Sequence, residues 1–408
     1  MDRALRAPTV ADFSPPRQRD LSFPVLLAMA AVALNLTLSA NALFALGIPY
    51  AAPGGSMLVK LHPGTYLAIA AFFLSFRPAT AGAAGPLFFA AMMLLCVVYT
   101  ALTTGTDHAV VFLESFLPAG LLAVVLGQAT AKARRLVGAL ILALVVVNAV
   151  ICVVEVLVQR HLVPLVVLDQ ALVELPGEFR GTALYDHPLT GATVTMIGIF
   201  LLLGLRPKPA VTAILLPILM VGLLGFGGRA ALGVTVLFLV VWGAAALLRR
   251  ALDRSLRRVH AVLVLGSVLL LPALTAVLLA KTSIGERIVL RFYWDSSAQA
   301  RSVQWHVLGL LSPRQVLFGM DYAGIGQLVA QLGLRFEITD IENFWLLMFL
   351  HVGAVGYGLF LAGFLALLMG QWRRAPLAGR LMLLAVLAVA SSSNSLARKS
   401  AILTILIP

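Results

Sequence analysis

Residues 136–158 read LVGALILALVVVNAVICVVEVLV, a run of 23 residues in which Glu155 carries the only charge. A helix needs about 20 mostly apolar residues to cross a bilayer, because every backbone polar group must be paired inside the lipid. The whole chain of 408 residues is 61% hydrophobic and 12% charged with a mean hydropathy of +1.00, whereas soluble domains carry about 25% charged residues. The composition therefore predicts a polytopic membrane protein.

Ten further runs satisfy the same length requirement, while residues 401–408 are too few to span alone. We expect an all-α polytopic membrane protein with about 11–12 transmembrane helices. It should form a single domain over residues 1–408, because no internal repeat, linker or separate soluble segment is visible. The ten runs are 23–44, 62–78, 84–102, 109–128, 189–205, 210–226, 230–248, 260–280, 344–370 and 380–396.

The charges divide unequally between the two sides of the membrane. Placing the basic N-terminus in the cytoplasm and alternating the spans puts 18 basic and four acidic residues inside, against 12 and 11 outside. This asymmetry follows the positive-inside rule, so the net charge of +13 indicates orientation, and we expect no nucleic-acid partner. Two long polar loops, 159–188 and 281–342, then both lie outside the cytoplasm, where we expect the working site.

The first of these loops ends in ELPGEFRGTALYDHPL, residues 174–189. Arg180 is suited to a bidentate grip on phosphate oxygens, and His187 is suited to accepting a proton near neutral pH. The alternative is that Arg180 pairs with Glu174 or Glu178 while His187 only caps the helix that starts at Pro188.

A second arginine follows a glycine-rich turn, in the sequence Gly225-Phe226-Gly227-Gly228-Arg229. Two interpretations of Arg229 remain open, a ligand-facing cation or a side chain that reaches outward to the lipid headgroups.

The second loop carries a cationic and aromatic pattern. Six residues recur at intervals of four, three, four, three and four, so they share one face if the segment is helical. Such a face suits a diphosphate and sugar rings, and it equally suits an amphipathic helix in the membrane interface. The six residues are Arg287, Arg291, Trp294, Ala298, Arg301 and Trp305.

An acidic group closes the second loop, with Glu337, Asp340 and Glu342 ahead of Asn343. Glu342 is a candidate general base for a hydroxyl group, although most acidic groups at a membrane surface are simply solvated. Neither metal-ligand spacing nor a glycine-rich nucleotide loop is present, so we expect no metal and no cofactor.

The order of these motifs resembles the O-antigen polymerase and ligase superfamily of membrane glycosyltransferases. The resemblance covers about residues 120–370 and rests on four pieces. These are Arg180-Gly181-Thr182 with His187-Pro188, the turn Gly228-Arg229-Ala230-Ala231-Leu232, Arg301-x-x-x-Trp305 leading to Leu317-Phe318-Gly319, and the span containing Gly353, Gly356 and Gly358.

This resemblance implies a GT-C-like enzyme in the bacterial inner membrane with a periplasmic active site. It would transfer glycan from undecaprenyl diphosphate with inversion and without a metal. Arg180 and Arg291 or Arg301 would hold the diphosphate with support from Arg229. Arg287, Trp294, Trp305 and Tyr185 would contact substrate, and Glu342 or His187 would act as base. A chain-length regulator and a flippase are the implied protein partners.

Two departures from the family pattern refine the expectation. Glu342-Asn343 stands where the family often has His-Asn, and ligases in particular tend to have that histidine. Gly319-Met320-Asp321 replaces the usual Gly-x-Gly. The missing histidine favours polymerisation of an exopolysaccharide or O-antigen over ligation to a lipid acceptor.

A transporter or flippase of lipid-linked sugars is the main rival, because eleven or twelve spans suit one. Transporters place ionisable residues near the midplane and show repeated halves, whereas Glu114 and Glu155 lie within a turn or two of an outer span end. A structural partner of a secretion complex is a further alternative.

Overall fold

The computed structural model describes residues 21–48, 50, 60–76, 83–167, 170–171, 179–252, 303–336, 340–397 and 402–406. These ranges are almost entirely helical, and seven of their helices are long and apolar enough to cross a membrane, which confirms an all-α polytopic membrane protein. The seven are α4 (Ala84–Thr103), a continuous helix made of α5 (Thr106–Val111), a π-helix (Phe112–Phe116) and α6 (Leu117–Gln128), then α7 (Ala131–Val158), α8 (Pro188–Leu205), α9 (Pro209–Phe226), α10 (Arg229–Leu252) and α16 (Phe344–Arg374).

Shorter apolar helices fall within three more of the predicted runs. They are α1 (Phe23–Thr37), α3 (Pro63–Ser75) and α17 (Leu377–Ala390), and a short α2 (Ala40–Ala45) follows α1. The run 260–280 lies outside the described residues, so a total of about 11–12 spans stays a prediction.

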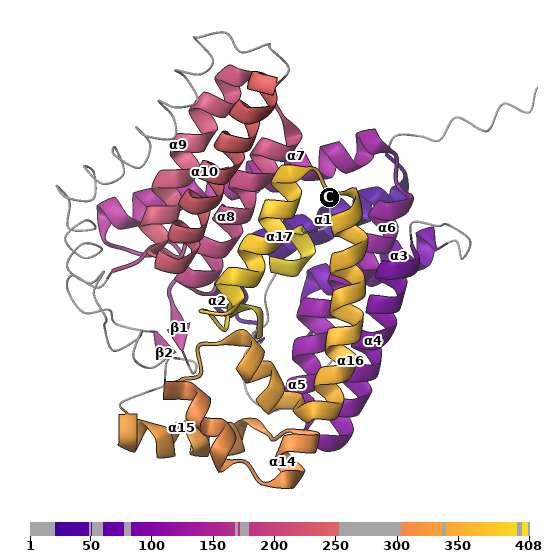
Figure 1. Cartoon of the computed structure of the whole chain (residues 1–408), viewed down its shortest axis with the longest axis vertical. Coiled ribbons are helices and arrows are strands. Elements are labelled where there is room, and N and C mark those ends of the chain that lie inside the picture. The colour runs from indigo at the N-terminus through magenta and orange to yellow at the C-terminus, as the bar shows by residue number, and fades with distance from the viewer. Residues whose placement is uncertain are drawn as a thin grey trace, which may run out of the picture.

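The helices pack side by side as one bundle (Figure 1). α4 lies along α16, α7 packs against α8 and α9, and α1 packs against α3. In the first long loop, β1 (Val166–Val167) and β2 (Gln170–Ala171) form a two-residue antiparallel pair, with Val166 opposite Ala171.

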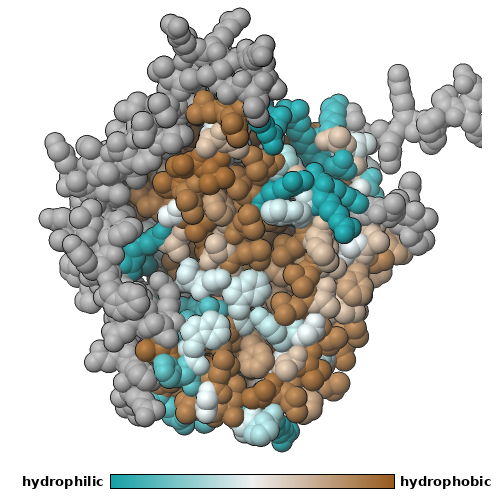
Figure 2. Space-filling view, viewed as in Figure 1, coloured by the Kyte–Doolittle hydropathy of each residue, from teal (hydrophilic) through white to brown (hydrophobic). Residues whose placement is uncertain are grey.

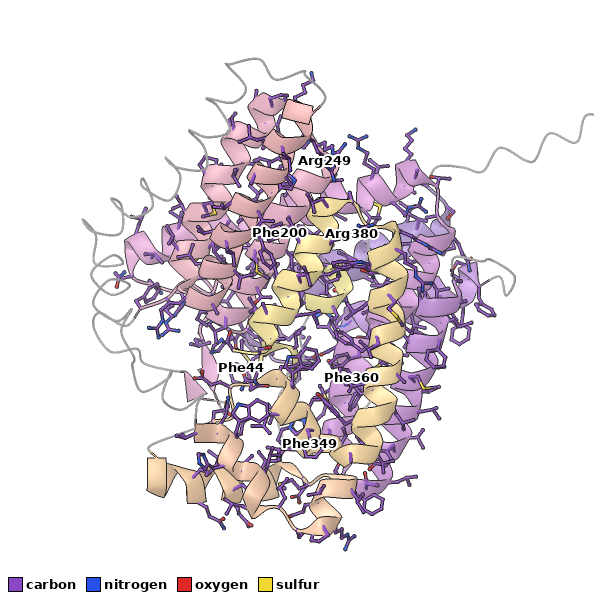
Figure 3. All side chains as sticks on the ribbon, viewed as in Figure 1. Phe44, Phe200, Arg249, Phe349, Phe360 and Arg380 are labelled. Atoms are coloured by element: carbon purple, nitrogen blue, oxygen red, sulfur yellow. The ribbon has the colours of Figure 1, made fainter. Side chains whose placement is uncertain are left out.

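Helix α16 is a hairpin rather than one straight span. Gly353 has φ 62° and ψ −177°, which reverses the chain, and the ring of Phe344 lies 6.0 Å from that of Phe360. In a straight α-helix sixteen residues rise about 24 Å, so the segments 344–352 and 354–374 must lie side by side as two arms. Figure 3 labels Phe349 on the first arm and Phe360 on the second. The prediction of one span over residues 344–370 is therefore wrong for residues 344–352, which form a separate arm. The second arm, residues 354–374, is still long enough to span a membrane.

Helix α17 ends earlier than the predicted run 380–396, at Ala390. Its carboxyl end faces the amino end of the first arm of α16, because Asn343 Nδ2 donates to the carbonyl of Ser391 (2.9 Å) and Trp345 Nε1 donates to its hydroxyl (3.1 Å). Asn394 Nδ2 likewise donates to the carboxylate of Asp340 (2.9 Å). Non-helical backbone inside an apolar bundle requires such polar partners.

The two ends of the bundle carry different elements. Arg249 and Arg380 mark one end, and α14 (Pro313–Phe318) and α15 (Tyr322–Phe336) lie across the other (Figures 1 and 3). Helix α15 buries Ile325, Leu328 and Leu332, which share one helical face. Figure 2 shows apolar residues over much of this view, with the largest group of hydrophilic residues at its upper right.

Candidate functional site

A buried carboxylate on α7 fixes the chain around Arg180. Glu155 is only 3% exposed, and its Oε2 accepts hydrogen bonds from the backbone N–H groups of Thr182 (2.8 Å) and Ala183 (2.7 Å). Its Oε1 accepts from the N–H of Leu162 (2.7 Å), at the start of the same loop. One side chain therefore holds both ends of the loop. The contacts of Glu155 with the backbone give this carboxylate a structural role.

Two further contacts hold the same segment against α7. Asn148 Oδ1 accepts from the N–H of Leu184 (3.1 Å). Gly181 lies so close to α7 that a Cβ atom there would be 2.5 Å from Cys152 Sγ. Since Cys152 leaves no space for a side chain here, only glycine fits at residue 181 without a shift of its surroundings.

These contacts bring Arg180 to the turn between α9 and α10. The N–H of Gly181 donates to the carbonyl of Gly225 (3.2 Å), and Arg180 Cδ lies 3.4 Å from where a Cβ on Gly227 would be. Gly227 has φ 68°, a left-handed conformation that suits glycine, and Arg229 begins α10 two residues later. Two arginines from separate motifs therefore lie at one place on the bundle, and both are half-buried.

His187 and Tyr185 are both held by local contacts around the start of α8. His187 is the N-cap of α8, and its Nδ1 accepts from the N–H of Leu189 (3.1 Å), so this nitrogen is occupied in capping. Tyr185 is 3% exposed and packs against Phe226 with ring centroids 5.8 Å apart. Its ring is therefore not available for stacking on a sugar, although its hydroxyl lines a cavity.

The end of the second loop is tied to the start of α16. Gln304 is buried, and its Oε1 accepts from the N–H groups of Glu342 (3.0 Å) and Asn343 (3.3 Å). The neighbouring Trp305 is 49% exposed in a 3-10 helix (Gln304–Leu310), and Glu342 is half-buried. Arg287, Arg291, Trp294 and Arg301 lie outside the described residues.

A polar cluster that sequence reasoning missed surrounds Glu114 in the π-helix. The carboxylate accepts from the hydroxyl of Tyr50 and from the backbone N–H of His62, so it holds both ends of the segment between them. The only sequence signal was the charge of Glu114 within an apolar run, because Tyr50 and His62 come from a different part of the chain. Single-turn π-helices occur frequently at functional sites.

A second missed cluster lies at the tip of the α16 hairpin. The rings of His108 and His351 stack with centroids 4.1 Å apart, and Tyr322 of α15 contacts His108 at 4.1 Å. Both histidines are nearly fully buried. The cluster therefore fastens helix α15 to the hairpin.

Comparison with known proteins gives no relative. No protein-family model, curated protein or solved structure matches this chain.

Proposed function

We propose that this chain is a membrane glycosyltransferase that polymerises glycan repeat units carried on a lipid diphosphate. The sequence resemblance implies that this lipid is undecaprenyl diphosphate. The observation that carries the proposal is the convergence of Arg180 and the Gly227–Arg229 turn, with Arg180 Cδ 3.4 Å from the Cβ position of Gly227. Arginine binds phosphate oxygens in a planar, bidentate geometry, and two such groups match the two phosphates of a diphosphate.

The chemistry needs little more than charge stabilisation and positioning. A hydroxyl of the acceptor attacks the anomeric carbon of the donor glycan from the face opposite the diphosphate, with inversion. The diphosphate leaves with the electron pair of the broken bond, and arginines neutralise the charge that develops on it. Holding both glycans in one orientation replaces an encounter in solution by a step within one complex. GT-C-like architecture, an inner-membrane location and a periplasmic site belong to the same proposal.

The experiment compares glycan size in cells that carry Arg180→Ala or Arg229→Ala, with membrane abundance of each variant measured. Arg380→Ala is the control, because Arg380 lies at the opposite end of the bundle, where it contacts Trp372. Single repeat units should accumulate outside the cytoplasm in the first two variants and not in the control. Normal polymer length in both arginine variants would contradict the proposal.

A transporter of lipid-linked glycan is the second candidate, and the helix ends at Ala390 and Phe344 favour it. Transporters bind substrate where interrupted helices meet, and hydrogen bonds from Asn343 and Trp345 to Ser391 join the end of α17 to the start of the first arm of α16. In that case variants at Asn343 or Ser391 would trap repeat units on the cytoplasmic side. Ligation of glycan to a lipid acceptor is the third candidate. In that case the Arg180→Ala and Arg229→Ala variants would still make polymer, but the polymer would not be attached to its lipid acceptor.

A further inference from the structure

A cavity of about 50 Å³ lies between the amino-terminal helices and the segment before α8. A water molecule occupies about 30 Å³ in the liquid, so the cavity has room for one or two groups of that size. Its wall is mainly polar side chains from five separate segments, namely Asn35, Tyr50, His62, Glu114, Tyr185 and Asp186.

Two polar atoms around this cavity have no partner among the described residues. These are the hydroxyl of Tyr185 and the amide nitrogen Nδ2 of Asn35, and both atoms are buried. A buried donor without an acceptor loses its hydrogen bond to water and gains none in return, so such groups indicate a missing polar occupant. The Tyr185 side chain is 3% exposed, which excludes bulk water as its partner.

Two carboxylate side chains, those of Glu114 and Asp186, lie on the cavity wall and can accept hydrogen bonds. Glu114 is already bound by Tyr50 and His62 at the buried side. Asp186 is half-buried, and its backbone is fixed because its carbonyl accepts from Asn41 Nδ2 (3.2 Å). A group that both donates to a carboxylate and accepts from an amide or phenol matches this wall, and a hydroxyl does both.

We propose that the cavity receives the attacking hydroxyl of the acceptor glycan and that Asp186 is its general base. This inference rests on the proposed function. As the hydroxyl oxygen forms its bond to the anomeric carbon, its proton passes to the Asp186 carboxylate. The bond from that carbon to the diphosphate breaks, and its electron pair leaves with the diphosphate. Tyr185 and Asn35 donate hydrogen bonds that orient the attacking oxygen.

The placement of His187 supports this choice of base. Its Nδ1 accepts the Leu189 N–H as the helix cap, whereas Asp186 is the adjacent residue and lines the cavity. The same cap keeps the backbone of Asp186 at the start of α8, so the carboxylate is positioned by a rigid element.

The experiment uses the full-length protein in lipid nanodiscs. The donor is lipid-linked glycan extracted from cells that lack this chain, and the acceptor is the same glycan with the diphosphate removed, so that it cannot act as donor. We expect Asp186→Asn to lower kcat about 100-fold with little change in the donor KM, as loss of a general base does. The wild-type rate should rise with pH as the base loses its proton, and this rise should vanish in Asp186→Asn. Asp107→Asn is the control, since Asp107 is an exposed carboxylate on α5.

Tyr185→Phe is the second variant, and it removes one oxygen atom that has no partner among the described residues. It should fold normally and raise the acceptor KM about 3- to 10-fold, which is the effect of one neutral hydrogen bond. Unchanged kinetics in Tyr185→Phe and a retained pH dependence in Asp186→Asn would show that the cavity holds only water, and would overturn the inference. If Arg180→Ala nevertheless abolishes transfer in the same assay, the proposed function stands although the inference about the cavity fails. If wild-type protein transfers no glycan, both fail.

Discussion

Gly319 and Gly353 meet backbone to backbone at the tip of the α16 hairpin. A Cβ on Gly319 would lie 2.5 Å from the carbonyl oxygen of His351, and a Cβ on Gly353 would lie 2.5 Å from the carbonyl of Leu317. The hairpin reverses at the point where the chain before α15 crosses it, and Met320 N–H donates to the carbonyl of Leu350 (2.9 Å). The two arms of the hairpin are therefore held at their tip by the close contact of two glycines.

The first prediction concerns this contact. Gly353→Ala should destabilise the protein by about 2 kcal/mol or more, because a left-handed φ costs a non-glycine residue about 1–2 kcal/mol before the clash is added. Thermal unfolding in detergent measures the loss. Gly358→Ala is the matched control, since Gly358 is in the second arm with open space around its Cβ position. Equal unfolding temperatures for the two variants would contradict the hairpin.

The second prediction tests the side-by-side arms directly. Phe344→Leu and Phe360→Leu should show a coupling free energy of about 0.5–1.5 kcal/mol in a double-mutant cycle, the range for interacting aromatic pairs. The control cycle pairs Phe344→Leu with Leu365→Ala, because Leu365 is 50% exposed. A straight α16 would leave both cycles additive.

The third prediction concerns the loop held by Glu155. Glu155→Gln keeps the size of the side chain but replaces a carboxylate oxygen by an NH₂ group that faces backbone N–H donors. Hydrogen bonds to charged groups contribute about 1.5–3 kcal/mol each, so we expect a loss of about 2 kcal/mol or more and faster proteolysis between Leu162 and Thr182. Wild-type rates of cleavage in this variant would show that the carboxylate does not hold the loop.

The fourth prediction concerns the approach of Gly181 to α7. Gly181→Ala should displace Arg180 and reduce glycan polymerisation, because the new methyl group meets Cys152 Sγ. Combining it with Cys152→Ala should restore activity in part. Full recovery is not expected, since the Cys152 carbonyl oxygen would still lie 3.0 Å from the added Cβ. No recovery at all would mean that contact with the sulfur is not the cause of the defect.

Sequence reasoning recovered the features that depend on local composition. The apolar runs gave the membrane class, and each run in the described ranges contains a helix. The family resemblance assigns Arg180 and Arg229 to one diphosphate, and that role stays a prediction, although Arg180 does lie against Gly227 of the turn before Arg229. The cap that His187 forms on α8 is one of the two roles that its position before Pro188 predicts.

Other features depend on contacts between segments that are distant in the sequence, and such contacts cannot be predicted from composition and periodicity. Residues 344–370 remain apolar through the reversal at Gly353, so hydropathy cannot distinguish a span from a hairpin. The polar residues 391–395 follow an apolar run, yet their role depends on Asp340 and Asn343. Glu114 and Glu155 were visible as buried charges, but their backbone partners were not.

The hydrogen bonds of Glu155 to the backbone of both Leu162 and Thr182 close the first loop, and Arg180 lies only two residues before the second of these anchors. Insertions, deletions or exchanged sequences within that interval leave the two anchored ends in place, since the anchoring bonds reach only the backbone of the flanking residues. We therefore expect the part of the loop between Leu162 and Arg180 to tolerate insertions, because lengthening a loop whose ends are already fixed costs little free energy.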